Sequence, residues 1–170
     1  MPFEARIETL KGALPKVTYR WDSETDILSV ACKTSGRTSG MTGMVDLEGG
    51  DGSFVILDIG AGVLRGLDVV AWPEDIRTNA GLKVPSPEKN ARVIFPTRPS
   101  QPGVAAVEVD TSLTVEKNTD ESVLHLAVGH IRPASVVAVG DYLLVEVDKK
   151  SRLAGLWLLN VPPFPTPAES

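Results

Sequence analysis

Two acidic side chains are the best candidates for chemistry in this sequence. Asp58 lies within the apolar run Phe54–Ile59, and Glu146 lies within the apolar run Tyr142–Val147. Acids are depleted in strands, so their presence in strand-like runs needs a reason. If the two carboxylates faced each other, the pKa of one would be raised, as acid–base catalysis or a cation site requires. Each acid could instead edge a partly exposed face and pair with a Lys or Arg, which is the interpretation we favour.

The histidines and the cysteine do not form a recognisable site. His125 and His130 are the only histidines, and an odd separation puts them on opposite faces of a strand. Zinc needs three or four donors, and no cysteine or acidic cluster joins them at ligand spacing. His125 lies on the polar side of its run, which suits an exposed position. Cys32 lies on the apolar side of its own run without a nearby cation, which predicts a buried, inert thiol.

Two loops resemble ligand sites without meeting their requirements. Gly60–Gly62 and Gly66 approach a dinucleotide-binding loop, but the last glycine is one residue late and a strand-like segment follows it where a helix should begin. Asp22–Asp26 has the spacing of a calcium loop, but Ile27 and Lys33 stand where that loop needs Gly and Glu. Both loops are interpreted as hairpin turns. We therefore predict no catalytic residue, no metal site and no cofactor, and the question of an enzyme stays open, leaning to no.

The elements that would position these residues occur twice along the chain. Three blocks of the first half match blocks of the second half: Thr18–Ala31 with Thr114–Ala127 at an offset of 96, Phe54–Ile59 with Tyr142–Val147, and Leu64–Leu67 with Leu153–Leu156. The substitutions keep the aromatic, acidic or aliphatic type. We infer an internal duplication in which Asp58 and Glu146 are equivalent.

Each copy has the period-two pattern of short strands separated by polar turns. The predicted fold is all-β, or β-dominated α+β, with at most one or two short helices. Two homologous four-strand β-meander modules would pack about a pseudo-twofold as a sandwich or a partly closed barrel. The expected boundaries are 1–76 for the first repeat with its N-terminal segment, 77–105 for a proline-rich linker around the outside, 106–161 for the second repeat and 162–170 for a proline-rich, extended tail.

Three segments outside the matched blocks have weaker signals. Phe3–Leu10 has the apolar spacing of a short helix, while the alternation of Ala5–Thr9 allows a strand instead. Pro73–Arg77 could form one helical turn. Arg92–Phe95 could form an isolated edge strand within the linker.

The last apolar run, Leu156–Val161, has almost no polar face and must be covered by the other copy or by a second chain. Trp157, Leu159 and Val161 would form a core seam in the simplest case. If a monomer left them exposed, they would mark a patch for a protein partner or a homodimer.

Composition excludes several classes of protein. The chain has 170 residues, 42% of them hydrophobic, and a formal net charge of -5, which argues against a wholly disordered chain and against nucleic-acid binding. No apolar stretch reaches the roughly 18 residues that cross a bilayer, so we expect no membrane partner. The charged N-terminus is unlike a secretion signal and the single cysteine fits a reducing compartment, so we expect a cytoplasmic protein.

The first repeat resembles a known family. Trp21–Val30, with an aromatic residue and an Asp before an acidic turn and an apolar run, resembles the opening of the small prokaryotic domain of unknown function 2283 family. Val55–Ile59 followed by Leu64–Val70 is similar to the second half of that family. The resemblance covers Val17–Trp72 and more faintly Ser112–Val161, where the aromatic–Asp pair is missing. It implies a small β-rich module, here in tandem, and no catalytic residue.

These observations favour a non-catalytic binding or interaction module that engages a protein partner or a second copy of itself. The alternative is a small-ligand-binding protein or a hydrolytic enzyme with its site between the two repeats, near Asp58 and Glu146.

Overall fold

The protein is all-β in the parts of the chain that its computed structural model describes, residues 4–33, 40–96 and 104–165. No helix occurs in these ranges, and therefore none that could cross a membrane. The strands are Arg6–Thr9 (β1), Val17–Trp21 (β2), Leu28–Cys32 (β3), Thr42–Gly49 (β4), Phe54–Gly60 (β5), Val63–Ala71 (β6), Ile76–Thr78 (β7), Ala91–Ile94 (β8), Val104–Thr111 (β9), Leu113–Lys117 (β10), Leu124–Val128 (β11), Ala134–Gly140 (β12), Leu143–Asp148 (β13) and Leu153–Leu158 (β14). The all-β prediction is confirmed.

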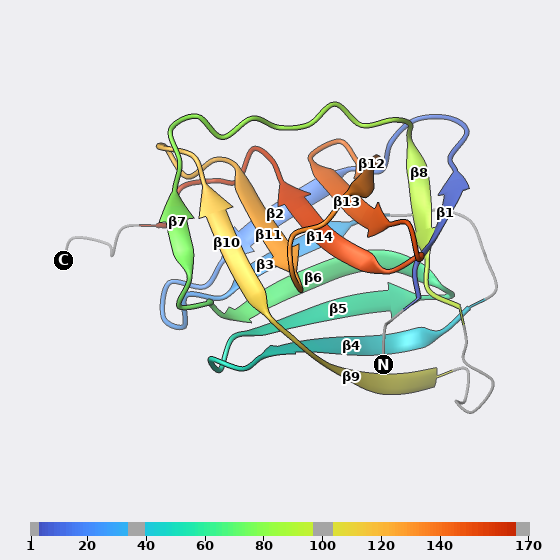
Figure 1. Ribbon diagram of the computed structural model, residues 1–170, viewed down its shortest axis with the longest axis horizontal. Helices are drawn as coiled ribbons and strands as arrows, with labels where there is room; N and C mark the ends of the chain where they lie inside the picture. Colours follow the sequence, from blue (N-terminus) through green and yellow to red (C-terminus); the bar gives the residue numbers. More distant parts are fainter. Residues whose placement is uncertain (1–3, 34–39, 97–103, 166–170) are drawn as a thin grey trace.

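The strands form two sheets that lie face to face (Figure 1). Sheet one has the order β1-β8-β6-β5-β4-β9, and the hairpin β2-β3 joins it through β6. Sheet two has the order β12-β13-β14-β11-β10-β7. The predicted sandwich therefore describes the arrangement of the two sheets.

Five strands of each sheet are paired in the same way. The order β2-β3-β6-β5-β4 in sheet one corresponds to β10-β11-β14-β13-β12 in sheet two. Ala31 lies opposite Gly66 as Ala127 lies opposite Gly155, and the register shifts directly after Asp58 in β5 as it does after Glu146 in β13. Each set has five strands where the sequence analysis expected four. The additional strands are β4 and β12, which pair with β5 and β13 and were not predicted.

The connection between the two sets also contributes strands. β7 follows β6 in the chain but pairs in parallel with β10 of sheet two, while β9 pairs in parallel with β4 of sheet one. The expected isolated strand at Arg92–Phe95 is β8, which is not isolated, because it pairs along its length with β1 and at one residue with β6. The two sheets are thus tied together by strands exchanged between them.

Neither expected helical segment is helical. Arg6–Thr9 is strand β1, so the strand alternative for Ala5–Thr9 is confirmed and the helix is wrong; Phe3 lies outside the described residues. Pro73–Arg77 forms no helical turn, because Ile76 and Arg77 already belong to β7. Short isolated helices are marginal in water, whereas a neighbouring strand offers ladder hydrogen bonds at once. Pairing with β8 therefore makes Arg6–Thr9 a strand, and pairing with β10 makes Ile76–Thr78 a strand.

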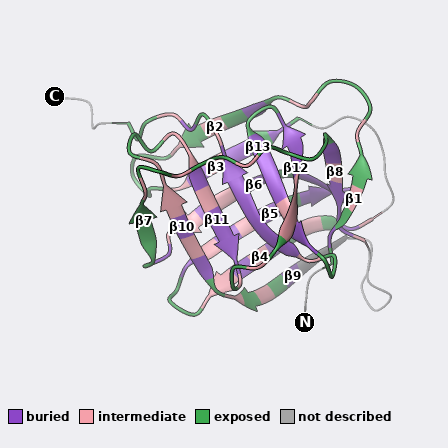
Figure 2. Cartoon of the chain, turned by 45° about the horizontal axis from the view of Figure 1, so that its top comes forward, coloured by how far each residue is buried: buried purple, intermediate pink, exposed green. Residues whose placement is uncertain are grey.

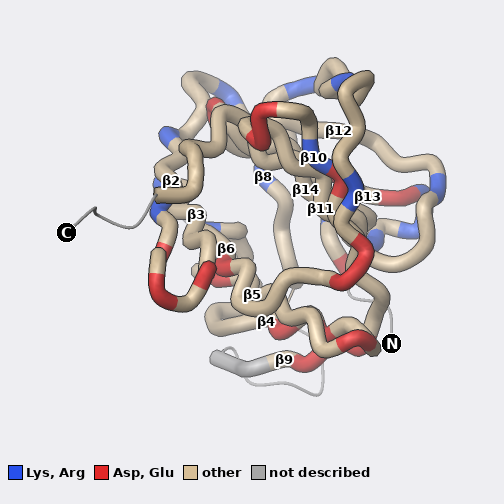
Figure 3. Tube along the Cα trace, turned by 90° about the vertical axis from the view of Figure 1, so that its left-hand side faces the viewer, with Lys and Arg blue, Asp and Glu red and all other residues tan. Residues whose placement is uncertain are grey.

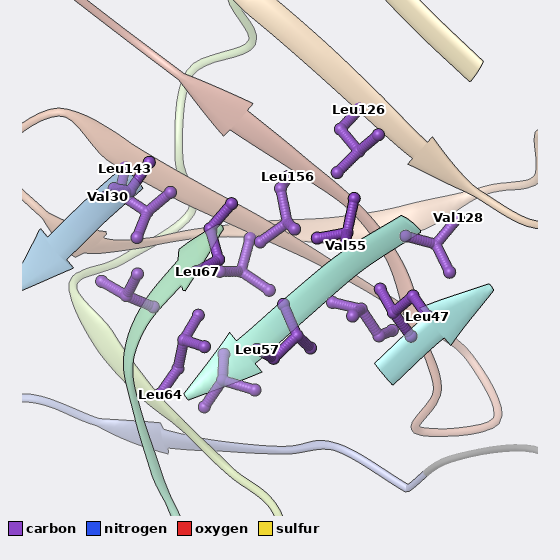
Figure 4. Close-up of a cluster of buried hydrophobic side chains, with 14 of the residues drawn as sticks. Val30, Leu47, Val55, Leu57, Leu64, Leu67, Leu126, Val128, Leu143 and Leu156 are labelled. Carbon is purple, nitrogen blue, oxygen red and sulfur yellow. The ribbon is translucent and has the colours of Figure 1, made fainter. Parts of the chain in front are cut away.

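The core lies between the sheets (Figure 4). Leu57 and Leu67 of sheet one and Leu143 and Leu156 of sheet two belong to one buried cluster, and Figure 4 shows their side chains gathered in the same region. Burial of one such side chain stabilises the folded state by about 2 kcal/mol. Figure 2 shows this buried centre within a more exposed rim.

The outer face of sheet two has a core of its own. Ala138, Leu144 and Trp157 form a second buried cluster, and Leu14 and Leu82 pack against it. Leu82 belongs to the segment between β7 and β8, drawn in green in Figure 1, which runs on the sheet-two side of the molecule. The segment between β7 and β8 therefore covers the outer face of sheet two, whereas Ala91–Ile94 of the expected linker is strand β8 of sheet one and contributes Ala91 and Val93 to the core.

Candidate functional site

Asp58 lies on the outer face of sheet one. Its neighbours in β5, Leu57 and Ile59, are buried in the core, so alternation turns Asp58 away from the second sheet. The side chain is exposed and forms no ion pair or hydrogen bond with any described residue. Our favoured interpretation of an acid at the edge of an exposed face holds here, but the expected Lys or Arg partner is absent from the described residues.

Glu146 lies on the outer face of sheet two in a different environment. Its Oε1 is 2.6 Å from Nε2 of His125, and the two side chains are only 18% and 16% exposed. Trp157 stacks on the His125 ring with the ring centroids 4.2 Å apart. The expectation of an exposed His125 is wrong, because Trp157 and Glu146 enclose its ring.

Gly155 makes this contact possible. It lies in β14 between the strands that carry His125 and Glu146, opposite Glu146 in the register. A Cβ at Gly155 would clash with Oε1 of Glu146 and would lie 3.1 Å from Nε2 of His125. The absence of a side chain at this position thus leaves room for the two groups to meet across the strand.

The two acids are therefore not brought together. Asp58 and Glu146 point outward from opposite faces of the sandwich, because Leu57 and Val145, their neighbours in β5 and β13, point inward. A site between the repeats that uses both carboxylates has no support in this geometry. The space between the sheets is filled by the apolar core instead (Figure 4).

The expected partner patch is not a surface. Trp157 and Val161 are buried and Leu159 is half-buried. The cover that this apolar run needs comes from the chain itself, with sheet one on the inner side and the linker residue Leu82 on the outer side. The core-seam interpretation applies, and these three residues form no exposed apolar patch.

The remaining sequence candidates have structural roles. Cys32 is buried, and its Sγ lies 3.6 Å from the backbone oxygen of Val139. Burial, and to a smaller extent the negative charge of Asp141, raises the pKa of the thiol to about 11. Asp22–Asp26 is the turn between β2 and β3, and Gly60–Gly62 connects β5 to β6. Within the described ranges, no group of three His, Cys, Asp or Glu side chains could hold a metal ion.

The outer face of sheet one is hollowed around Asp58. A depression of about 380 Å³ is lined by residues of β2, β3, β4, β5 and β6, among them Arg20, Met44, Ile56, Asp58 and Arg65. Met44 is 48% exposed and is one of the few large apolar side chains left on the surface. The outer face of sheet one thus presents apolar and charged side chains side by side.

Acidic side chains extend this face toward its far edge. Asp46 lies opposite Glu108 and Glu48 lies opposite Asp110 in the parallel pair of β4 and β9. Like charges at directly opposite positions destabilise a sheet. None of these four acids has an ion pair with a described residue, and Figure 3 shows acidic positions along β4 and β9. We call Asp46, Glu48, Asp58, Asp68, Glu108 and Asp110 the acidic face.

The sequence analysis missed the acidic face because its members come from four strands. Asp46 and Glu48 are separated from Glu108 and Asp110 by about 60 residues, and only the pairing of β4 with β9 joins them. The alternation of acids with Val45, Leu47, Val107 and Val109 was a signal that these acids share one face of each strand.

A second group that the sequence did not predict is aromatic. Trp21, Trp72 and Phe164 meet at one end of the sandwich. Their positions lie at the end of β2, directly after β6 and in the C-terminal tail, so no local pattern connects them.

Comparison with known proteins gives no relative: no protein-family model matches the chain, and no curated protein is significantly similar to it. The resemblance to the domain of unknown function 2283 family stays a prediction.

Proposed function

We propose that this protein is a non-catalytic interaction module that binds an extended, basic segment of a protein partner on the outer face of sheet one. The observation that carries the proposal is the difference between two corresponding faces. The outer face of sheet two is covered by the chain's own linker, whereas the outer face of sheet one is open and carries the six acids of the acidic face, with Arg20 and Arg65 in the hollow around Asp58.

The covered face is a template for how an extended segment binds this fold. The backbone N–H of Glu88 donates to Val136 O at 2.8 Å, and the N–H of Ala138 donates to Lys89 O at 3.0 Å. Asn90 forms a parallel bridge with Ala138, and Leu82 packs on the apolar cluster around Trp157. Backbone hydrogen bonds at the sheet edge and an apolar side chain on the face hold the segment in place. In sheet one, β9 already pairs with the corresponding strand β4, so a partner segment would bind through side chains on the face.

The open face differs at the positions that the linker covers in sheet two. The registers make Asp46 correspond to Ala138 and Asp68 correspond to Trp157, so acids stand where sheet two is apolar. Met44 and Ile56 keep an apolar centre beside these acids. A partner that fits therefore supplies Lys or Arg for the carboxylates and an apolar side chain for the centre.

A cationic segment would also offset the repulsion between the opposed acids. Exposed ion pairs contribute only about 0.5 kcal/mol each and weaken with salt. Relief of the repulsion between Asp46 and Glu108 and between Glu48 and Asp110 adds to this gain when a cationic segment binds. Binding should thus be moderate in strength and strongly salt-dependent.

The methionines provide a direct test on the full chain. The probe is a synthetic ten-residue peptide of alternating Lys and Val, added to protein labelled at the methionine methyl groups. The Met44 methyl should shift on titration, while the buried Met41 methyl, only 2% exposed, should not. Binding should weaken as salt is raised, and a matched peptide with Glu in place of Lys should leave Met44 unchanged.

The double variant Asp46→Asn, Asp58→Asn should weaken binding of the Lys–Val peptide, while Glu88→Gln, on the exposed linker, should not. Equal shifts with the Lys and Glu peptides, or no shift at Met44 at low salt, would exclude a basic segment as the occupant of this face.

We also propose that the chain arose by internal duplication of a five-strand module. Support comes from the identical strand order, the matching registers at Gly66 and Gly155, and the register shift after each acid. Separately, we propose a cytoplasmic location, because a single buried cysteine, Cys32, suits a reducing compartment.

A further inference from the structure

An aromatic groove lies at the end of the sandwich where β2, β6 and β10 come together. Trp21 and Trp72 stack with centroids 5.7 Å apart and an interplanar angle of 25°. Phe164 of the C-terminal tail meets Trp21 edge-on, with centroids 5.2 Å apart and an angle of 77°. The acidic face is on a different surface, and the two sites share no lining residue.

The chain's own proline-rich tail occupies this groove through a hydrogen bond and ring packing. The indole Nε1 of Trp21 donates a hydrogen bond of 2.8 Å to the carbonyl oxygen of Pro162. Pro163, Phe164 and Pro165 continue the tail. An aromatic platform that packs on a proline-rich segment, together with a donor aimed at its carbonyl, is how extended proline-rich chains are recognised.

The tail is held less firmly than its counterpart in the other half. Pro73 and Pro162 follow the corresponding strands β6 and β14. After Pro73, the chain forms β7 and pairs with β10 by backbone hydrogen bonds. After Pro162, the prolines cannot donate such bonds, and the described contacts are the indole bond and the ring packing. A segment held by so few contacts can be displaced.

The tail also leaves part of the groove unfilled. A hollow of about 100 Å³ remains beside Phe164, and Trp21, Trp72, Ile76, Val115 and Leu124 line it. Phe164 itself stays 39% exposed and Ile76 stays 38% exposed. The ion pair of Lys117 with Glu121 stands at the rim. A segment with a further apolar side chain at this point would bury surface that the tail leaves open to water.

We infer that the aromatic groove binds a proline-rich segment of a partner protein, with an aromatic residue between prolines, in exchange for residues 162–165 of the chain's own tail. The tail acts as an intramolecular competitor, because its tether keeps it at an effective concentration in the millimolar range. Weakening the tail should therefore strengthen binding of the partner segment.

The test uses the full-length chain and a synthetic peptide with the sequence of residues 161–170. Binding is followed by tryptophan fluorescence, where the buried Trp157 contributes a constant background. Phe164→Ala removes the anchor ring of the tail and keeps the Pro162 carbonyl, so the peptide should bind this variant about tenfold more tightly than the unaltered chain. Ile131→Ala, which removes a side chain that is 83% exposed, is the matched control and should leave the affinity unchanged.

A second variant tests the indole donor. Trp21→Phe, combined with Phe164→Ala, keeps an aromatic ring but removes the N–H, and it should weaken peptide binding at least about fivefold at an unchanged unfolding midpoint. A peptide with alanine at every proline should bind neither protein.

The assignment is overturned if Phe164→Ala binds the peptide no better than the unaltered chain. It is also overturned if the unaltered chain forms a dimer that Phe164→Ala abolishes, because the occupant would then be the tail of a second copy. If the tail peptide binds but the Lys–Val peptide does not shift Met44, this inference holds and the proposed function fails. If the Lys–Val peptide shifts Met44 but the tail peptide does not bind, the proposed function holds and this inference fails.

Discussion

Replacement of Asp148 by Asn would test the buried charged cluster that ties two connections of sheet two together. The carboxylate is only 4% exposed and accepts hydrogen bonds from Arg132 Nε at 2.7 Å and from Arg152 Nε at 3.2 Å. Its other oxygen accepts hydrogen bonds from the backbone N–H groups of Lys150 and Arg152. One side chain therefore organises both the β13–β14 turn and Arg132, which precedes β12.

The magnitude follows from what Arg132 would lose and keep. Its side chain is 15% exposed, and removal of one partner of a buried ion pair costs about 3–5 kcal/mol. Arg132 would still donate to the carbonyl oxygens of Val128, His130 and Leu153. These remaining bonds reduce the cost, and we expect the free energy of unfolding to fall by about 2–3 kcal/mol.

The same substitution should change the acid sensitivity of the protein. Burial opposes ionisation of Asp148, but the hydrogen bonds from Arg132 and from the backbone of Arg152 and Lys150 outweigh it and hold the pKa at about 2. Because this folded-state pKa is below the unfolded value of about 3.9, the stabilisation is present above pH 4 and is lost as the pH falls toward 2. Solvent around Arg152 screens the effect, so it should amount to about 1–2 kcal/mol.

Urea denaturation at pH 7 and at pH 3 measures both effects. Asp148→Asn should lower the midpoint at pH 7 and should show a smaller further loss at pH 3 than the unaltered protein. Glu24→Gln removes an exposed acid and should change stability by less than about 0.5 kcal/mol. A loss below about 0.5 kcal/mol for Asp148→Asn, or an unchanged pH dependence, would refute the reasoning.

Two further substitutions or modifications test the interior. The thiol of Cys32, whose pKa burial raises to about 11, should react with iodoacetamide at pH 8 at least about a hundredfold more slowly in the native protein than in urea, as followed by intact mass; equal rates would contradict its burial. Gly155→Ala should lower the free energy of unfolding by about 1–3 kcal/mol because the new methyl group meets Glu146 and lies 3.0 Å from Leu126 O, whereas Gly50→Ala has open space and should be neutral; similar midpoints for the two would show that the contact between His125 and Glu146 does not need the glycine.

Much of the strand pattern could be predicted from the sequence because it depends on local alternation. Leu28 and Val30 point to the core as expected, and so do Leu143 and Val145, since successive side chains of a strand point to opposite faces. The two hairpin turns at Asp22–Asp26 and Gly60–Gly62 were predicted for the same reason, because turn chemistry is local. Arg6–Thr9 was ambiguous because four residues fit both periods, and only the presence of β8 decides for a strand.

Sequence by itself determined that strands dominate the fold, and it located several alternating runs that recur at matching positions. Tertiary structure alone decided what each face meets. Asp58 and Glu146 occupy corresponding positions, yet one is exposed and the other contacts His125, because the position that holds His125 in sheet two holds Ser29 in sheet one. The acidic face depends in the same way on the pairing of β4 with β9, and the aromatic groove depends on where the tail returns. Alternation assigns a side chain to a face, but the segments that cover that face arrive from distant parts of the chain.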